Sequence, residues 1–209
     1  MRSILREGRE WEIASPPDES LVETIRRSLD CSRPFAVLLA QRGGDSWEAL
    51  RDPDSSNFHS PFNLPDIEPA ILRLTEAIEK KERVFIHGDF DADGLSGAAV
   101  LYRGLRPLFS KNSIKVEVGD RLHGHGLSHP FVMHAIEEGF SLVITVDCGI
   151  GSHEEIAELR RAGIDTIVTD HHLPSATLPP AVAIVDPHRS DSSYPNRHLA
   201  GVGVAYKLI

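Results

Sequence analysis

The chain has 209 residues, of which 41% are hydrophobic and 25% charged, and its formal net charge is −9. This length supports one sizeable domain with a substantial core. The negative charge argues against a broad basic face for duplex DNA, so a nucleic-acid substrate needs metal ions and a local basic groove to hold it. No apolar stretch reaches the roughly 20 residues of a membrane helix, and residues 1–7 lack the apolar segment of a secretory signal.

The cysteine content indicates a reducing compartment. Cys31 and Cys148 are the only cysteines, and their positions are unrelated. Such a pair favours a reduced protein over a disulfide scaffold. We therefore expect a cytoplasmic location and no membrane partner.

Residues 1–65 differ in composition from the rest of the chain. They are rich in Pro, Ser and Asp, and their apolar spacing predicts helices near 21–29 and 34–41. The run at 52–57 is typical of a loop. We expect an N-terminal extension at 1–65 that packs on a catalytic domain at 66–209.

From Pro65 onward, helical and strand patterns alternate. Helices are predicted at 66–78, 94–108, 130–138 and 153–162, and strands at 84–86, 114–118, 142–146, 166–169 and 182–185. Repeated strand–helix units of about 25–30 residues give right-handed crossovers. The predicted fold class is therefore α/β, with a mostly parallel sheet of about five strands and helices on both faces.

The end of the chain carries an unfinished helical pattern. Apolar positions continue through 201–209 with no residue that would end a helix. We therefore expect the chain to be truncated within an element.

Acidic and histidine residues follow three of the apolar runs. They are His87, Asp89, Asp91 and Asp93, then Asp147, then Asp170, His171 and His172. In open α/β sheets, ligands bind beyond the carboxyl ends of the strands, so these groups should converge. So many carboxylates cannot remain ionised together without cations. Two divalent metal ions are the simplest explanation.

The first cluster can serve two metals from a single turn. His87, Asp91 and Asp93 are the candidate ligands, with Asp89 behind them. The following helix start also points amide donors into the site, which suits a phosphate. A calcium loop is an alternative, but its twelfth position is Val100 rather than Glu. Helix capping is a second alternative.

Asp147 ends the most hydrophobic predicted strand. A carboxylate there costs several kcal/mol unless it is paired or bound to metal, so a bridge between two cations is its best role. The alternative is a cap for the following helix. Cys148 fits a small buried residue better than a nucleophile.

The third cluster and a Gly-rich loop complete the candidate set. His171 and His172 are adjacent, so their side chains point in different directions, and one can bind metal while the other faces substrate. The loop at 121–128 contains Arg121, which can contact phosphate. An ordinary surface arginine is the alternative.

Together these segments resemble the DHH phosphoesterases, named for the triplet at 170–172, and within them the RecJ family of single-strand-specific 5′ exonucleases. The segments that carry the resemblance are 61–66, 87–94, 121–128, 144–150, 168–172 and 199–205. It covers most of 60–209 and implies a DHH-type domain with two Mn²⁺ or Mg²⁺ ions.

The resemblance also implies a role for each site residue. His87, Asp91 and Asp147 would hold one ion, and Asp93, Asp147 and His171 the second. His172 would contact the scissile phosphate and act with Asp147 in catalysis, and Arg121 would touch a substrate phosphate. Asp89 and Asp170 would support the ligands from behind.

The implied function is a metal-dependent 5′→3′ exonuclease that hydrolyses phosphodiester bonds of single-stranded DNA by a two-metal mechanism. It would act in DNA repair and recombination, with a helicase or a single-strand-binding protein as expected partner. Alternatives are a pyrophosphatase, a phosphoesterase of short oligonucleotides, or a non-catalytic replication scaffold.

The sequence departs from the family pattern in places. A further acidic ligand motif and the smaller second domain are not found in the 209 residues, and His125 replaces an expected tyrosine. We therefore expect this chain to be weakly active or inactive alone.

Overall fold

The computed structural model describes residues 2–6, 9–48 and 58–209, and the loop predicted at 52–57 lies outside them. Contacts divide the chain into two units, Met1–Phe58 and His59–Ile209. Residues 59–65 thus belong with the larger unit, and the packing of residues 1–65 on the core stays a prediction. Within the described residues, no helix has the length and apolar character needed to cross a membrane.

The smaller unit contains a hairpin and two helices. Strands β1 (Arg2–Arg6) and β2 (Arg9–Ile13) pair antiparallel, and α1 (Glu19–Leu29) and α2 (Arg33–Gly43) follow. Both predicted helices are present, and they bury Val22, Ile25, Ala36, Ala40 and Trp47 together. The hairpin was not predicted, although polar and apolar residues partly alternate in both of its strands.

The larger unit is built around one sheet. Its strands are β3 (Val84–Gly88), β4 (Ile114–Val118), β5 (Leu142–Val146), β6 (Asp165–Thr169) and β7 (Ala183–Val185). Its helices are α4 (Ile67–Glu79), α5 (Ala92–Leu105), α6 (His129–Glu137), α7 (His153–Arg161) and α8 (Gly201–Leu208). Short 3₁₀ turns lie at Pro61–Asn63, Arg106–Leu108 and Arg121–His123.

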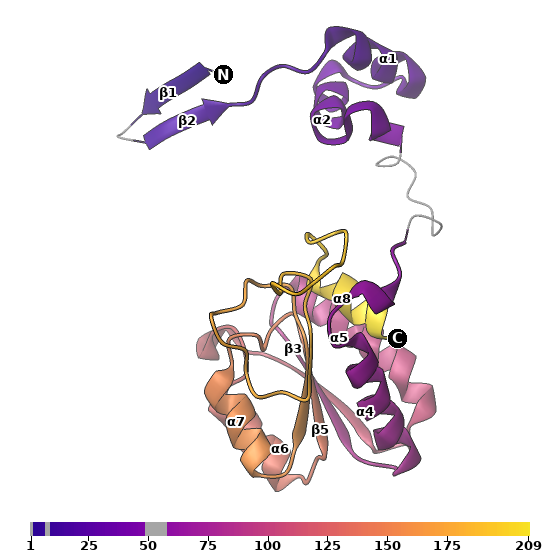
Figure 1. Cartoon of the computed structure of the whole chain (residues 1–209), viewed down its shortest axis with the longest axis vertical. Coiled ribbons are helices and arrows are strands. Elements are labelled where there is room, and N and C mark those ends of the chain that lie inside the picture. The colour runs from indigo at the N-terminus through magenta and orange to yellow at the C-terminus, as the bar shows by residue number, and fades with distance from the viewer. Residues whose placement is uncertain (1, 7–8, 49–57) are drawn as a thin grey trace. The chain divides into compact units, whose positions relative to one another are not determined.

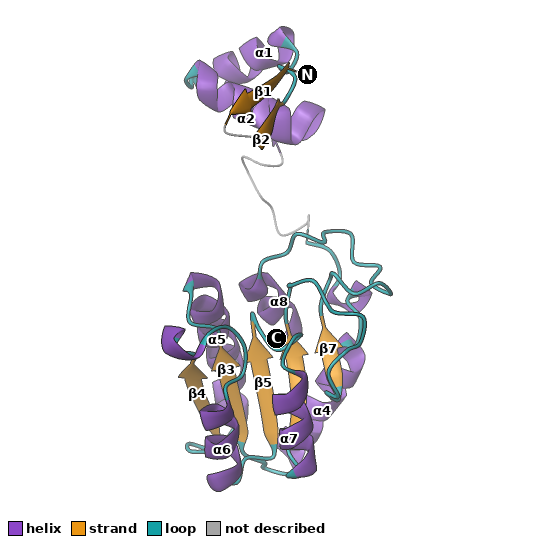
Figure 2. Cartoon of the chain, turned by 90° about the vertical axis from the view of Figure 1, so that its left-hand side faces the viewer, coloured by secondary structure: helices purple, strands orange, loops and turns teal. Residues whose placement is uncertain are grey.

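All five strands of this sheet are parallel, in the order β4-β3-β5-β6-β7 (Figure 2). Helices α4, α5 and α8 cover one face, and α6 and α7 cover the other (Figure 1). The predicted α/β class with helices on both faces is confirmed.

The strand residues alternate between the two layers. Val84 and Ile86 join the core under α4, α5 and α8, whereas Phe85 between them joins the core under α6 and α7. Every residue of β3 and β5 is buried. Apolar side chains on both faces explain why these strands are continuous hydrophobic runs in the sequence.

Helices α5 and α8 approach each other closely beside the sheet. A Cβ atom on Gly97 would lie 2.5 Å from Cγ1 of Val146, 3.3 Å from Cα of Val202 and 3.6 Å from Cβ of Ala205. Only glycine fits at this contact. The close packing of α8 on α5 therefore depends on a glycine, Gly97, within α5.

We predict that Gly97→Ala destabilises the fold by about 1–3 kcal/mol through overpacking. Helix propensity alone would make the variant more stable, because it favours alanine over glycine by about 1 kcal/mol. Denaturant unfolding measures the difference. The control is Gly151→Ala, where a Cβ would meet nothing within 4 Å, and the expected change is within about 0.5 kcal/mol. A Gly97→Ala variant more stable than the parent chain would contradict the close contact.

Candidate functional site

An aspartate follows each of four neighbouring strands at the carboxyl edge of the sheet. Asp89, Asp147, Asp170 and Asp186 follow β3, β5, β6 and β7 and are 2%, 2%, 1% and 0% exposed. The first three are in matching register, because each donates its N–H to the last carbonyl of the next strand over, at 2.9–3.1 Å. The fold thus places four buried carboxylates in one row.

Asp147 is shared by two groups of potential metal ligands. One group joins it to Asp89 and Asp91, and the other to His171 and His172. In each group the ligand atoms all lie within 4.8 Å of one another. The sharing agrees with the bridging position expected from the end of the central hydrophobic strand.

One oxygen of the Asp147 carboxylate, Oδ1, is buried and receives no hydrogen bond from any described residue. Burial, with the nearby charges of Asp93 and Asp91, raises the pKa of Asp147 to about 7. A bound cation would remove this penalty by supplying the missing positive charge.

His171 faces Asp147 in an arrangement that suits a shared ion. Its Nε2 atom lies 3.0 Å from Oδ1 of Asp147, yet that oxygen receives no hydrogen bond. Adjacent ligands of an octahedral ion with bonds of about 2.1 Å are about 3 Å apart. The same Nε2 atom lies 3.6 Å from Oδ2 of Asp93. Carboxylate and imidazole donors of this kind fit Mn²⁺ and Mg²⁺.

Asp91 and Asp93 both use backbone amides at a helix start. Oδ1 of Asp91 accepts the N–H groups of Asp93 and Gly94 at 2.8 and 3.1 Å, so it caps α5. These bonds, led by the one from Gly94, lower the pKa of Asp91. The oxygens of Asp93 instead accept N–H groups from the start of α8, those of Gly201 and Val202. The helix-capping alternative and the ligand role are thus compatible in one cluster.

His87 lies outside both groups of potential ligands. It is 2% exposed, its ring packs 4.2 Å from that of Phe131, and neither ring nitrogen has a hydrogen-bond partner among the described residues. Burial lowers the pKa of His87, which keeps the imidazole neutral, as a metal ligand must be. Asp89, expected behind the ligands, is itself in the group with Asp91 and Asp147.

Asp170 fixes the two histidines that follow it by hydrogen bonds. Oδ1 of Asp170 accepts the N–H groups of His171 and His172 and lies 2.7 Å from Nδ1 of His172, while Oδ2 accepts the N–H of Ile150. Burial acts to raise the pKa of Asp170, yet the hydrogen bonds from His172 and Ile150 hold it below its usual range. The Asp170 hydrogen bond raises the pKa of His172 to about 9. This hydrogen bond favours the protonated form of His172 in the metal-free protein.

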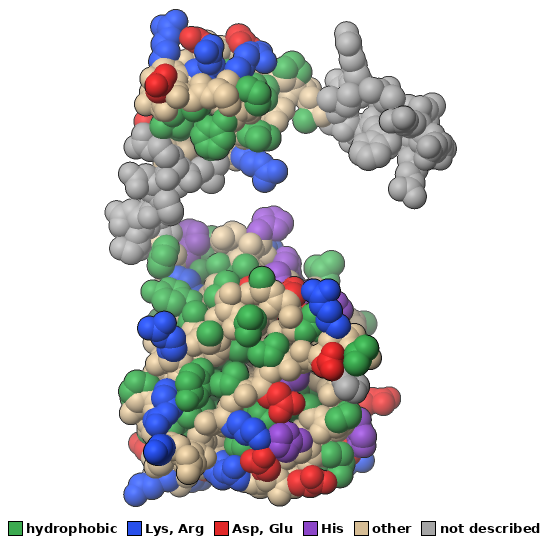
Figure 3. Space-filling model, turned by 180° about the vertical axis from the view of Figure 1, so that it is seen from behind, with side chains coloured by type: hydrophobic (Ala, Val, Ile, Leu, Met, Phe, Trp, Pro, Cys, Tyr) green, Lys and Arg blue, Asp and Glu red, His purple; other side chains and the backbone are tan. Residues whose placement is uncertain are grey.

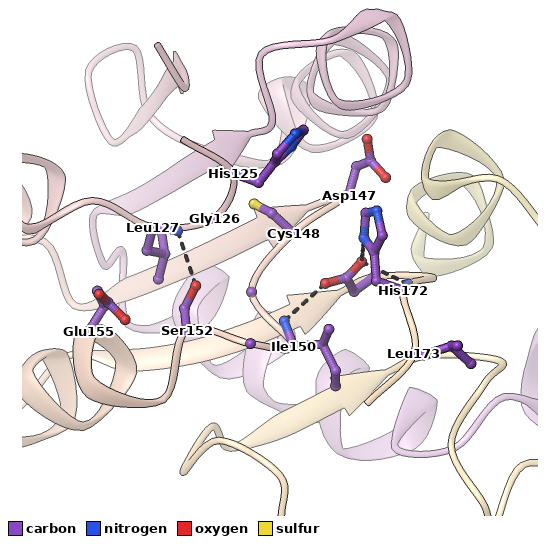
Figure 4. A pocket seen from close by; sticks show the side chains of 13 residues that line it. His125, Gly126, Leu127, Asp147, Cys148, Ile150, Ser152, Glu155, His172 and Leu173 are labelled. Atoms are coloured by element: carbon purple, nitrogen blue, oxygen red, sulfur yellow. Dashed lines mark hydrogen bonds and ion pairs between the residues drawn. The ribbon is translucent and has the colours of Figure 1, made fainter. Parts of the chain in front are cut away.

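A cavity of about 520 Å³ opens beside these groups (Figure 4). It is lined by His125, Gly126, Leu127, Asp147, Cys148, Gly149, Ile150, Gly151, Ser152, Glu155, Asp170, His172 and Leu173. The imidazole of His172 and the carboxylate of Asp147 lie next to each other there (Figure 4). The volume is within the range of small-molecule sites.

An exposed stack of side chains lies next to Asp89. Nδ1 of His125 is 3.0 Å from Oδ2 of Asp89, and the His125 ring packs on Phe90 with centroids 4.5 Å apart. Cζ of Arg121 lies 5.3 Å from the centroid of the Phe90 ring. Arg121, predicted to contact phosphate, thus lies against the residue between Asp89 and Asp91 and does not line the cavity.

Sequence reasoning missed several residues that shape the site. Asp186 is fully buried with Oδ2 unpartnered, and burial raises its pKa to about 7. Its Oδ1 accepts the N–H of His188, whose ring is hydrogen-bonded to the carbonyl of His171. The signal for Asp186 was available, because it too follows an apolar run. The contact of the Gly201 and Val202 amides with Asp93 could not be found from the sequence, because it involves only backbone groups of those residues.

Comparison with known proteins identifies the family of this chain. The sequence is 37% identical over 202 residues to the single-stranded-DNA-specific exonuclease RecJ of Bacillus subtilis (strain 168), covering 95% of this chain and 25% of that protein. Among solved structures, RecJ of Thermus thermophilus in complex with Mn²⁺ matches with a TM-score of 0.66 and 31% identity, over 95% of this chain and 28% of that one. An exonuclease RecJ bound to manganese matches with a TM-score of 0.64 and 37% identity, over 72% and 38%.

The chain spans about a quarter of the length of the curated RecJ proteins that it matches. A family model described as "DHH family, N-terminal domain" matches residues 83–209, which is more than half of the chain. This region contains the five-stranded parallel sheet and all four aspartates of the carboxyl edge. The chain therefore belongs to the DHH family and carries its N-terminal domain.

Proposed function

We propose that this chain is the catalytic lobe of a metal-dependent exonuclease that hydrolyses single-stranded DNA from the 5′ end in repair and recombination. The observation that carries the proposal is the buried, unpartnered oxygen of Asp147 between two groups of potential ligands. The RecJ proteins that the chain resembles are named as single-stranded-DNA-specific exonucleases, and two RecJ structures contain manganese.

The residues that would hold two divalent ions follow from the geometry and from the family resemblance. Asp147 serves both ions. Asp91, with Asp89 or the buried His87, completes one site, and Asp93 and His171 complete the other. When bound, two such ions supply positive charge to the attacking and leaving oxygens of an in-line displacement at phosphorus.

His172 and Arg121 supply positive charge from the protein itself. Held by Asp170, the His172 imidazolium borders the cavity next to Asp147 and is in place to contact the scissile phosphate. Arg121, on the exposed Phe90 stack, is in place for a phosphate further along the strand. Asp170 acts by orienting His172, because it is buried and its oxygens are occupied by hydrogen bonds.

The surface charge favours a local contact with one strand. Basic and acidic side chains are intermixed over the face of the larger unit that Figure 3 shows, and the net charge is −9. A single strand threaded to a metal site needs no broad basic face. A helicase or single-strand-binding partner stays a prediction. A cytoplasmic location also stays a prediction, and it is based on the two free cysteines, Cys31 and Cys148.

The proposal is tested by supplying Mn²⁺ with either 5′-phosphorylated single-stranded DNA or pyrophosphate, with the protein in excess over substrate. We expect mononucleotides from the DNA and no orthophosphate from pyrophosphate. Orthophosphate release would instead identify a pyrophosphatase. Binding of two metal ions with no hydrolysis of either substrate would contradict the proposed activity of this chain.

We predict that the chain binds two Mn²⁺ ions and that Asp147→Asn weakens both sites by at least about tenfold. The amide keeps the volume of the side chain but removes its charge, so it cannot serve both ions. Calorimetric titration gives the stoichiometry and affinity. Asp45→Asn, an exposed aspartate of the smaller unit, is the control and should bind as the parent does. Two tight sites in Asp147→Asn would refute the shared position.

We predict that the His172 ring titrates near pH 9, as followed by its NMR signals. Because folding raises this pKa, the His172–Asp170 pair stabilises the fold below pH about 6.5, and the stabilisation is lost as the pH rises through about 9. Asp170→Asn should move the midpoint toward about 6.5. Asp191→Asn, which breaks the ion pair of an exposed aspartate with the buried Arg189, should leave the His172 midpoint unchanged. An unchanged midpoint in Asp170→Asn would exclude this pair as the cause.

A further inference from the structure

The first turn of α8 has an unusual cap. Its own N-cap residue, Ala200, makes no side-chain hydrogen bond to the helix. The free amides are satisfied by Asp93, more than 100 residues earlier in the chain: the N–H of Gly201 donates to Oδ2 at 2.8 Å, and that of Val202 donates to Oδ1 at 2.6 Å. Each oxygen of Asp93 accepts one amide, which fixes both the position and the rotation of the carboxylate.

The same turn lies directly against Asp147. A Cβ atom on Gly201 would be 2.6 Å from Oδ1 and 2.8 Å from Cγ of Asp147. Gly201 is buried, and no side chain fits between the helix and that carboxylate. One turn of backbone therefore contacts two carboxylates on different elements, Asp93 in α5 and Asp147 after β5.

We propose that residues 200–202 form a backbone clamp that positions Asp93 and confines Asp147, so that both carboxylates face Nε2 of His171. The clamp acts through amides and the absence of a side chain, and none of its residues is itself a ligand. The inference rests on the proposed function, in which Asp93, Asp147 and His171 hold one of the two divalent ions.

Electrostatics explains why such a clamp is needed. Two carboxylates that face one nitrogen repel each other, and the charge of Asp93 contributes to the raised pKa of Asp147. Hydrogen bonds from two amides, at the positive end of a helix, hold the Asp93 carboxylate against this repulsion. They keep Asp93 close to Asp147, where it would otherwise rotate toward solvent.

Val202→Pro tests the clamp selectively. It replaces the N–H that donates to Oδ1 of Asp93 with the ring Cδ of proline, which removes the hydrogen bond and forces that oxygen to move away. It costs no hydrogen bond within α8, because the first intrahelical bond runs from Val204 to Ala200. Proline is tolerated in the first turn of a helix. We expect Mn²⁺ titration to show one site weakened by about tenfold or more, while the other, built on Asp89, Asp91 and Asp147, keeps its affinity within about twofold.

Two further variants separate positioning from general loosening. Gly201→Ala puts a Cβ against Asp147, so both Mn²⁺ sites should weaken while thermal unfolding remains cooperative. The matched control is Gly203→Ala in the same helix, where a Cβ would meet only the flexible side chain of Leu199, and both sites should persist. If Val202→Pro does not fold, the contrast between Gly201→Ala and Gly203→Ala decides the question.

The outcomes are distinct. Unchanged Mn²⁺ binding in Val202→Pro and Gly201→Ala would overturn the clamp and leave the proposed function standing. An equal loss at both sites in Val202→Pro, or a loss in Gly203→Ala as large as in Gly201→Ala, would also overturn it, because loosening of the helix would then be the cause. Absence of Mn²⁺ binding in the parent chain would overturn the proposed function, and the clamp with it.

Discussion

Burial of negative charge at one edge of the sheet is the constraint on which the site depends. Four aspartates follow neighbouring strands, and each is almost completely shielded from water. Asp89 is paired with His125, and Asp170 is satisfied by His172 and backbone amides. Asp147, between them, has Nε2 of His171 3.0 Å from its Oδ1, but that oxygen receives no hydrogen bond within the described part of the chain, and Oδ2 of Asp186 also receives none. The carboxyl edge therefore combines two aspartates that the protein satisfies itself with two that keep a buried oxygen without a hydrogen bond.

The parallel topology brings these aspartates together although they lie far apart in the sequence. Parallel strands place all their carboxyl ends on one side, so residues that follow different strands meet although dozens of residues separate them. The helices that cross between the strands end on the opposite side. The amide groups of two helix starts, those of α5 and α8, consequently point into the same region as the carboxylates.

Much of the fold could be predicted because the inner strands are buried on both faces and the edge strand alternates. The bounds predicted for 142–146 are those of β5, a continuous apolar run. The bounds predicted for 114–118 are those of β4, an edge strand in which apolar and charged residues alternate. The N-terminal hairpin was missed because the short alternation in each strand was outweighed by the Pro-, Ser- and Asp-rich composition around it. Strand ends and helix starts shifted by one or two residues, which is usual for fraying elements.

The site was predictable where chemistry resides in side chains and unpredictable where it resides in the backbone. Asp147 and His171 could be brought together from sequence because each follows a strand. The contact of Asp93 with the start of α8 could not, because an amide N–H is common to almost every residue. Nor does the sequence show that Asp89 joins the group with Asp91 and Asp147 while His87, inside β3, lies outside that group, since only side-chain direction separates the two residues.

The distance along the chain between Asp93 and Gly201 has a consequence for folding. The two ends of this contact enclose most of the larger unit, including four strands of the sheet, β4 to β7. A contact of such high sequence separation forms only after the intervening loop entropy has been paid, which places it late in the folding sequence. We therefore expect Asp93 to come into line with Asp147 only when the larger unit is almost fully folded, so a partly folded chain lacks the carboxylate geometry of the native site.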